Sequence, residues 1–211
     1  MPHLVLLGDS IFDNAAYTGG GPDVVSQVRD ALPPEWTASL LAVDGATTSD
    51  VVNQIPLLPP DSTHLILSVG GNDVLMESSV LDLPASSTAQ AVGYLADVVL
   101  KFERDYRVAI EACTRPGLPL VVCTIYNGCF DDSEFQRVVS TALSVFNDAI
   151  FRVATENHLP VIDLRPVCAN PEDYANPIEP SSVGGEKIAR VLAAVVTGAS
   201  GYDGETRVVG A

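Results

Sequence analysis

The chain has 211 residues, of which 47% are apolar and 18% are charged, and this composition favours one globular domain over a disordered segment. Its 11 basic and 27 acidic residues give a formal charge of −16, which repels nucleic acids and anionic lipid surfaces. No apolar run approaches the roughly 20 residues of a membrane span, and the first residues lack the basic and apolar segments of a secretory signal. We therefore expect a cytoplasmic protein with no membrane span and no nucleic-acid partner.

Short apolar runs alternate with segments of helical period in the first half of the chain, a pattern typical of strands that alternate with helices. The first expected strand is His3–Leu7. A helix from about Asp23 to Leu32 follows it and stops before two prolines. Thr37–Val43 and Leu65–Val69 are the second and third expected strands. Between them, Ser49 would cap a short helix that ends at Pro56.

The second half of the chain continues the alternation. The segment Ser87–Ala112 has the apolar spacing of one helix face, with Val92, Leu95, Val99, Phe102, Tyr106 and Ile110 directed inward. Leu118–Thr124 is the fourth expected strand, since its continuous β-branched run is typical of burial on both faces. A helix capped by Ser133 follows, with Phe135, Val139, Phe146, Ile150 and Val153 inward. Pro160–Leu164 is the fifth strand, and Gly185–Val196 is the last helix.

Five parallel strands joined by helices predict a three-layer α/β/α sandwich with right-handed crossovers. Residues 1–198 would form this domain, and residues 199–211 a C-terminal tail. In such sheets ligands bind outside the carboxyl ends of the strands. Functional residues should therefore follow a strand rather than precede one.

Three polar groups follow successive strands. Ser10 comes directly after the first strand in Gly8-Asp9-Ser10, Gly45 lies in the turn after the second, and Asn72 follows the third. A hydroxyl, a backbone N–H and a carboxamide at one sheet edge make a nucleophile beside an oxyanion hole. Because losing one such donor typically costs about 100- to 1000-fold in rate, the grouping indicates catalysis.

These segments carry a family resemblance. Gly8-Asp9-Ser10, Gly45 and Gly71-Asn72-Asp73 resemble the first three blocks of the SGNH, or GDSL, hydrolase superfamily, and the likeness extends over essentially the whole chain. The resemblance implies a flavodoxin-like sandwich with strand order 2-1-3-4-5. It also implies ester or acyl hydrolysis, with Ser10 as the nucleophile and with Gly45, Asn72 and the Ser10 backbone N–H as oxyanion donors.

The last block of the family, D-x-x-H followed by Pro, is altered here. Asn176 occupies the aspartate position and Glu179 the histidine position, while Pro180 and Gly184 fix the alignment. A carboxylate buried near an apolar pocket can have its pKa raised toward neutrality, so Glu179 is the candidate base. An equally weighted alternative is that Glu179 only holds the loop.

Other residues are weaker candidates for the missing base. The three histidines, His3, His64 and His158, each precede a strand, and a five-residue strand of roughly 17 Å would separate them from Ser10. The remaining carboxylates near strand ends or in the last loop are Asp9, Asp73, Asp163 and Asp173. Tyr126 and Asn127 follow the fourth strand and are candidates to line the pocket, although a packing role in the core is the favoured interpretation for the tyrosine.

No cofactor or metal is predicted, because the four cysteines form no C-x-x-C pair and the histidines are scattered. An oxygen-ligand site formed by Glu179, Asp73 and Asp9 is a weak alternative. We interpret Cys113 and Cys123 as buried thiols, and a Cys129–Cys168 disulfide as the weaker of the two interpretations for that pair.

The leading hypothesis is a serine esterase that acts on small neutral esters through Ser10, Gly45, Asn72 and Glu179. Loss of the histidine costs one serine protease about a million-fold in rate. A catalytically silent ligand-binding domain is therefore the second hypothesis. An acyltransferase that passes the acyl group from Ser10 to an alcohol is the third.

Overall fold

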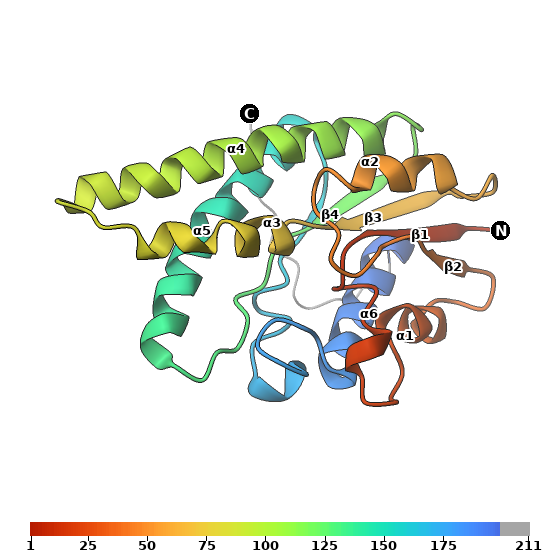
Figure 1. Ribbon diagram of the computed structural model, residues 1–211. Coiled ribbons are helices and arrows are strands. Elements are labelled where there is room, and N and C mark those ends of the chain that lie inside the picture. The colour runs from red at the N-terminus through yellow and green to blue at the C-terminus, as the bar shows by residue number, and fades with distance from the viewer. Residues whose placement is uncertain (199–211) are drawn as a thin grey trace.

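The computed structural model describes residues 1–198, and the expected tail at 199–211 lies outside the described residues. Over that range the chain forms a parallel five-stranded sheet in the order β2-β1-β3-β4-β5, with helices on both faces (Figure 1). The strands are β1 His3–Gly8, β2 Thr37–Leu40, β3 His64–Ser68, β4 Leu120–Cys123 and β5 Val161–Ile162. The predicted sandwich and its strand order are confirmed.

Two helical layers enclose the sheet. The α-helices are α1 Val24–Ala31, α2 Val51–Gln54, α3 Gly71–Met76, α4 Thr88–Thr114, α5 Ser133–Glu156 and α6 Ser182–Thr197. Short 3₁₀ turns are η1 Ala15–Tyr17, η2 Ile55–Leu57, η3 Ser78–Asp82 and η4 Pro171–Asp173. α1 and α6 cover one face, while α2, α4 and α5 cover the other (Figure 1).

β1 explains why the sheet lies at the centre. All of its residues are buried. Leu4 and Leu6 pack toward α1 and α6, whereas Val5 and Leu7 pack toward α4 and α5. Fully burying such a side chain contributes about 1.5–3 kcal/mol. A strand that contributes to two cores therefore needs a continuous apolar run, as the sequence has here.

Three strands are shorter than expected. β4 spans Leu120–Cys123 instead of Leu118–Thr124. β2 ends at Leu40 rather than Val43, because the N–H groups of Leu41 and Ala42 both donate to the carbonyl of Leu6 and so break the ladder. β5 has two residues instead of five. Its ladder stops where the Leu164 N–H donates to the Thr124 hydroxyl, 3.0 Å away, rather than to a backbone carbonyl.

Three helix starts also differ from the expectations. α2 begins after Asp50 rather than Ser49, and Pro56 lies inside η2 instead of ending a helix. The side chain of Asp132 caps α5, so that Ser133 is the first helical residue. α6 begins at Ser182, before the expected Gly185. In each case a neighbouring residue occupies the cap position, which the sequence pattern locates only approximately.

Two residues expected to face inward are exposed. Val92 is 59% exposed and Phe135 is 45% exposed. Both lie in the first turns of their helices, and Figure 1 shows the start of α4 extending past the sheet. The apolar spacing continues there, although the sheet that would bury it has ended.

α5 is, among the described residues, the one helix long and apolar enough to cross a membrane, with a mean hydropathy of 1.2. Phe146, Ile150 and Val153 of this helix pack in the core. Its hydropathy therefore reflects burial against the sheet, as in core helices generally.

All four cysteines are free. Cys113 and Cys123 are buried as expected, and burial raises the pKa of both thiols. The weaker interpretation of Cys129 and Cys168 as a disulfide is wrong, because each carries a free thiol.

Candidate active site

The end of β1 is held rigidly before Ser10. Gly8 has a φ of 120°, and a Cβ there would lie 1.7 Å from the carbonyl oxygen of Ser68, so that only glycine fits. The side chain of Gln54 binds both backbone groups of Gly8: its Oε1 accepts from the Gly8 N–H and its Nε2 donates to the Gly8 carbonyl, each at 2.8 Å. The hydroxyl of Ser10 is thereby placed just past the carboxyl end of the strand.

Ser10 and Glu179 meet although 169 positions separate them in the chain. The Ser10 hydroxyl donates to Glu179 Oε1 at 3.1 Å, and both side chains are buried. Glu179 Oε2 has no hydrogen-bond partner among the described residues. The carboxylate therefore keeps one oxygen free while the other contacts the serine.

The loop that carries Glu179 is held by side chains from elsewhere. Asn176 Oδ1 accepts from the N–H groups of Ile178 and Glu179, each at 3.0 Å. Asn14 is fully buried, and its Nδ2 donates to the carbonyl of Pro180 at 3.1 Å. Asn176, at the aspartate position of the family block, therefore orients the backbone around Glu179 and not a histidine ring.

Three of the weaker carboxylate candidates are occupied elsewhere. Asp73 accepts from the N–H and the hydroxyl of Thr48. Asp163 pairs with Arg165 at 2.7 Å. Asp173 is fully buried, forms an ion pair with Lys187 at 2.5 Å, and accepts two backbone N–H bonds. These three carboxylates therefore stabilise the surrounding loops through their own hydrogen bonds and ion pairs.

A cavity opens beside Ser10, and we call it the active-site cavity. Its polar lining comes from Asp9, Ser10, Asn72, Asn127 and Glu179. The rest is mostly apolar and includes Ile11, Val74, Leu75, Ile125, Tyr126, Phe130, Val139, Leu143 and Ile178. Asn127 and Tyr126 both line the site, and Tyr126 also packs in the core, as the sequence favours for this tyrosine. An apolar enclosure with a few converging polar groups is the usual form of a small-molecule site.

The expected oxyanion donors differ in their positions. Asn72 lines the cavity, and one of its two amide N–H groups donates to the carbonyl of Ala46 at 2.9 Å, which leaves the second free. Gly45 is not among the lining residues. Among the described residues, the backbone N–H groups of Ser10 and Gly45 donate to no protein acceptor. The roles of all three donors stay predictions.

Two carboxyl groups in the cavity titrate near neutrality. Burial raises the pKa of Glu179 to about 7, with a further contribution from the charge of Asp44. Burial also raises the pKa of Asp9 to about 8, and the charge of Glu179 adds to it. Within residues 1–198, no lysine, arginine or histidine lines the cavity, so no cation from these residues opposes the shifts.

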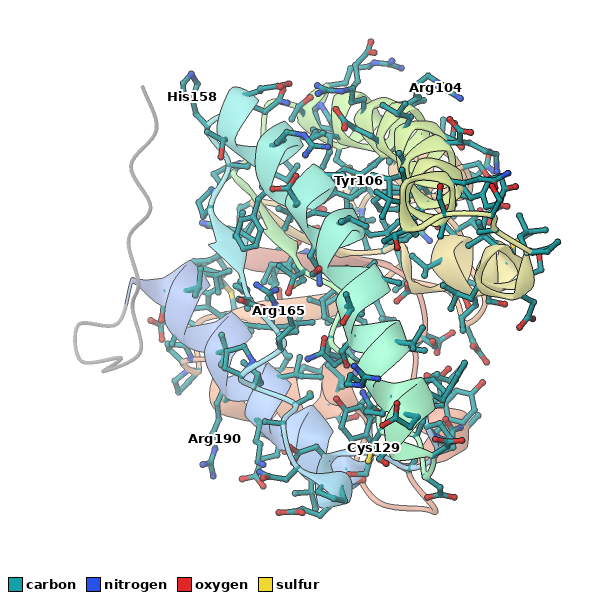
Figure 2. The ribbon with its side chains drawn as sticks, turned by 90° about the vertical axis from the view of Figure 1, so that its left-hand side faces the viewer. Arg104, Tyr106, Cys129, His158, Arg165 and Arg190 are labelled. Atoms are coloured by element: carbon teal, nitrogen blue, oxygen red, sulfur yellow. The ribbon has the colours of Figure 1, made fainter. Side chains whose placement is uncertain are left out.

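None of the three histidines lies near Ser10. His3 and His64 begin β1 and β3 at the amino edge of the sheet, and His3 shares a hydrogen bond with Ser39 at 2.8 Å. Figure 2 shows His158 beyond one end of α5 and Cys129, from the loop that lines the cavity, beside the other end. The structure confirms that the histidines lie at the opposite edge.

Within residues 1–198 no group of three or more histidine, cysteine, aspartate or glutamate side chains is arranged to hold a metal ion. Asp9, Asp73 and Glu179 do not form such a group. We therefore assign these carboxylates no metal-binding role.

The sequence did not reveal the helical walls of the cavity. α3 was not expected, yet it supplies Asn72, Val74 and Leu75. α5 supplies Val139 and Leu143 from its first turns. The sequence signal that could have revealed the α3 wall is the apolar pair Val74-Leu75, which directly follows the predicted oxyanion segment at the functional edge of the sheet.

Comparison with known proteins identifies the family of this chain and its fold. Residues 6–184 match the model of the GDSL-like lipase/acylhydrolase family, a range that includes both Ser10 and Glu179. A search of curated protein sequences found no significant match.

Several solved structures share the fold. The extracellular lipase of Streptomyces rimosus superposes with a TM-score of 0.67 at 15% identity, covering 95% of this chain and 100% of that one. Phospholipase A1 from Streptomyces albidoflavus gives 0.65 at 16% identity, covering 94% and 99%. The lipase/acylhydrolase of Enterococcus faecalis gives 0.63 at 20% identity, covering 94% and 96%. At these identities the likeness establishes the fold alone.

Proposed function

Because the chain belongs to the GDSL-like lipase/acylhydrolase family, we propose that it is a carboxylic ester hydrolase with an altered base. Ser10 is the nucleophile, and Glu179 accepts the proton that a histidine takes in the family's usual block. The observation that carries this proposal is the 3.1 Å hydrogen bond from the Ser10 hydroxyl to Glu179 Oε1. Hydrogen-bond reach is the first requirement for a general base.

The proposed reaction has two halves. In the first, Ser10 Oγ attacks the ester carbonyl carbon while its proton moves to Glu179 Oε1. The tetrahedral intermediate then collapses, and Glu179 returns the proton to the departing alcohol. In the second half, Glu179 takes a proton from water, which attacks the acyl-serine. The second tetrahedral intermediate then collapses with cleavage of its bond to Ser10 Oγ, and Glu179 returns the proton to Oγ, which releases the carboxylic acid and regenerates the Ser10 hydroxyl.

The raised pKa of Glu179 suits this role. An ordinary glutamate is too weak a base to take a serine proton, whereas burial brings the pKa of Glu179 to about 7, close to a useful operating pH. Glu179 must be ionised to act, so its fraction in the active form increases as the pH rises through about 7.

A glutamate base also changes the charge balance of the transition state. A histidine becomes positive when it takes the proton and attracts the oxyanion, whereas Glu179 becomes neutral. The hydrogen-bond donors must then stabilise the oxyanion without a nearby cation. We assign this task to the Ser10 N–H, the free Asn72 amide N–H and the Gly45 N–H, and we expect slower turnover than a histidine would support.

The charge of the site favours an uncharged substrate. Its lining, as far as residues 1–198 form it, contains two carboxyl groups and no basic side chain, in a protein with a net charge of −16. An anionic ester would be repelled on approach and within the site. We therefore propose neutral carboxylic esters as the substrate class.

Hydrolysis of p-nitrophenyl butyrate tests the proposal. We expect Ser10→Ala to abolish turnover above background, and Glu179→Gln to lower kcat by about 100- to 10,000-fold, the usual contribution of general-base catalysis. Glu172→Gln, an exposed carboxylate in the same loop, is the matched control and should keep wild-type activity. Equal rates for wild type, Ser10→Ala and Glu179→Gln would refute the proposal.

A catalytically silent binding domain is the second candidate. It is favoured by the hydrogen bonds of Asn176, which hold only the backbone of its own loop. Stoichiometric labelling of Ser10 by a fluorophosphonate would exclude it, whereas no labelling would support it. The third candidate, acyl transfer to an alcohol, would appear as a new ester when an alcohol is added to the assay.

A further inference from the structure

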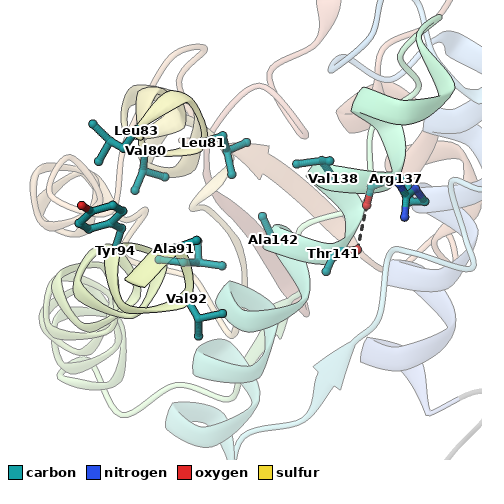
Figure 3. A pocket seen from close by; sticks show the side chains of 11 residues that line it. Val80, Leu81, Leu83, Ala91, Val92, Tyr94, Arg137, Val138, Thr141 and Ala142 are labelled. Atoms are coloured by element: carbon teal, nitrogen blue, oxygen red, sulfur yellow. Dashed lines mark hydrogen bonds between the residues drawn. The ribbon is translucent and has the colours of Figure 1, made fainter. Parts of the chain in front are cut away.

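A second apolar cavity is lined in part by the same helix, α5, as the active-site cavity, and we call it the apolar groove. It has a volume of about 350 Å³ and is bounded by η3, by the start of α4 and by the start of α5 (Figure 3). Its lining includes Val80 and Leu81 from η3, Ala91 and Val92 from α4, and Val138 and Ala142 from α5.

The two cavities share the same pair of walls. On α5, Val138 and Ala142 line the apolar groove, whereas Val139 and Leu143 line the active-site cavity. Residues four apart stack along one helix face, so these are adjacent stripes of one helix. The opposite wall is also shared, because α3 ends at Met76 and η3 begins at Ser78, with Glu77 between them, and Leu75 of α3 lines the active-site cavity.

In the part of the chain that the structure describes, the lining of the apolar groove has a single charged side chain. Arg137 is the charged residue of its lining, and its guanidinium is paired with Glu134 at 2.7 Å. Around it, Val92, Val138 and Leu83 are exposed despite their size. Neighbouring exposed apolar side chains that line a groove mark a binding surface more often than chance.

We propose that the apolar groove binds the distal part of the substrate's acyl chain while the ester carbonyl lies at Ser10. The enzyme then prefers long-chain acyl esters, beyond the small esters that the sequence suggests. This inference rests on the proposed function, and the occupant follows from the position of the groove along the walls of the active-site cavity. Each additional buried methylene would raise kcat/KM about fourfold.

A substitution that fills the groove tests the inference. We would measure kcat/KM for p-nitrophenyl butyrate, octanoate and laurate with wild type and Ala91→Trp. Ala91 is exposed on α4 and lines the groove, so the indole occupies it without burial in the core. We expect the value for laurate to fall at least about tenfold and that for butyrate to stay within about twofold. The control is Ala96→Trp, exposed on the same helix but absent from both linings.

A second pair of variants removes apolar character instead of volume. Val92 lines the groove and is 59% exposed, whereas Val108 lies on the same helix outside the groove and is 56% exposed. The two variants compared are Val92→Asn and Val108→Asn. We expect Val92→Asn to lower kcat/KM for laurate about threefold to tenfold, and Val108→Asn to leave it unchanged.

A binding measurement separates this inference from the proposed function. A methyl ketone with a lauryl-length chain cannot be hydrolysed, and calorimetry would report its affinity even if turnover were absent. Weaker binding to Ala91→Trp than to Ala96→Trp supports the groove. Equal binding of the ketone to both variants overturns the acyl-chain inference, as does a dependence of kcat/KM on chain length that Ala91→Trp leaves unchanged. In either case, hydrolysis of the butyrate ester still supports the proposed function.

Other occupants of the groove are outcomes of the same variants. If Val92→Asn turns a dimer into a monomer in sedimentation and leaves laurate hydrolysis unchanged, the groove binds a second copy. If it abolishes binding to neutral phosphatidylcholine vesicles with the same unchanged hydrolysis, the groove meets a lipid surface. Either result overturns the acyl-chain assignment.

Discussion

The two sides of the active-site cavity are built differently. On one side, the end of β1 and the loop around Glu179 are held by Gln54, Asn14 and Asn176 through buried or backbone-directed hydrogen bonds. On the other side, α3 and α5 line the cavity, and next to them η3 and the first turns of α4 and α5 leave apolar side chains exposed around the apolar groove. Reacting groups need fixed geometry, whereas an acyl chain needs only apolar surface. The difference suggests that chemistry and chain selection lie on opposite walls.

The largest expected effect comes from a substitution at the end of β1, on the rigidly held side of the cavity. Gly8→Ala places a Cβ against the Ser68 carbonyl oxygen in a left-handed backbone, so we expect a loss of unfolding free energy of about 4 kcal/mol or more, with loss of activity. Urea denaturation measures the change. Gly117→Ala is the control, since Gly117 also has a positive φ, of 73°, but an added Cβ would meet no described atom within 4 Å, and it should cost about 1 kcal/mol.

The next effect concerns the base. kcat/KM for p-nitrophenyl butyrate should rise with pH through about 7, because Glu179 must be ionised and burial sets its pKa there. In Glu179→Gln this limb should disappear together with most of the activity. A wild-type profile that is flat between pH values of about 5 and 9 would exclude Glu179 as the base.

The buried carboxyl group of Glu179 should lower the free energy of unfolding at alkaline pH. The pKa of Glu179 is raised in the folded protein, so folding binds more protons between its unfolded pKa and about pH 7. Its favourable contribution is present below the unfolded pKa and is lost as the pH rises through about 7. We expect Glu179→Gln to be more stable than wild type by about 1–3 kcal/mol at alkaline pH, with no such gain in acid. Urea titrations on both sides of pH 7 would show the crossover.

A smaller effect should follow from loosening the loop. Asn176→Ala removes the acceptor for the N–H groups of Ile178 and Glu179, and we expect kcat to fall about tenfold with KM unchanged. Asn176→Asp keeps that acceptor and should restore the rate, while its charge should move the pH limb of Glu179 upward. A fall in stability without a change in kcat would mean that Asn176 has no positioning role.

The smallest effect belongs to the open side. Arg137 pairs with Glu134 on the surface, and exposed pairs contribute less than about 1 kcal/mol. Arg137→Gln should leave both the unfolding midpoint and laurate hydrolysis nearly unchanged. A large loss of laurate hydrolysis would show that the groove reads charge and not only apolar surface.

Much of the fold could be predicted from the chain. The continuous apolar run at β1 and the alternation of strands and helices indicate a parallel sheet, because burial on both faces requires that composition. The three polar segments at strand ends located Ser10 and Asn72 correctly at the cavity. The strand ends were less accurate, since a competing hydrogen bond such as that from Leu164 to Thr124 ends a ladder without a local sequence signal.

By itself, the sequence determined which strand ends carry polar groups and that no histidine follows a strand, because periodicity and order along the chain are local properties. Only the tertiary structure decided that Glu179 lies against Ser10, since that contact joins residues from opposite ends of the domain. The exposure of Val92 and Phe135 was likewise decided by where the sheet stops and not by their spacing. Burial, and with it the raised pKa of Glu179, depends on what the rest of the chain packs around a side chain.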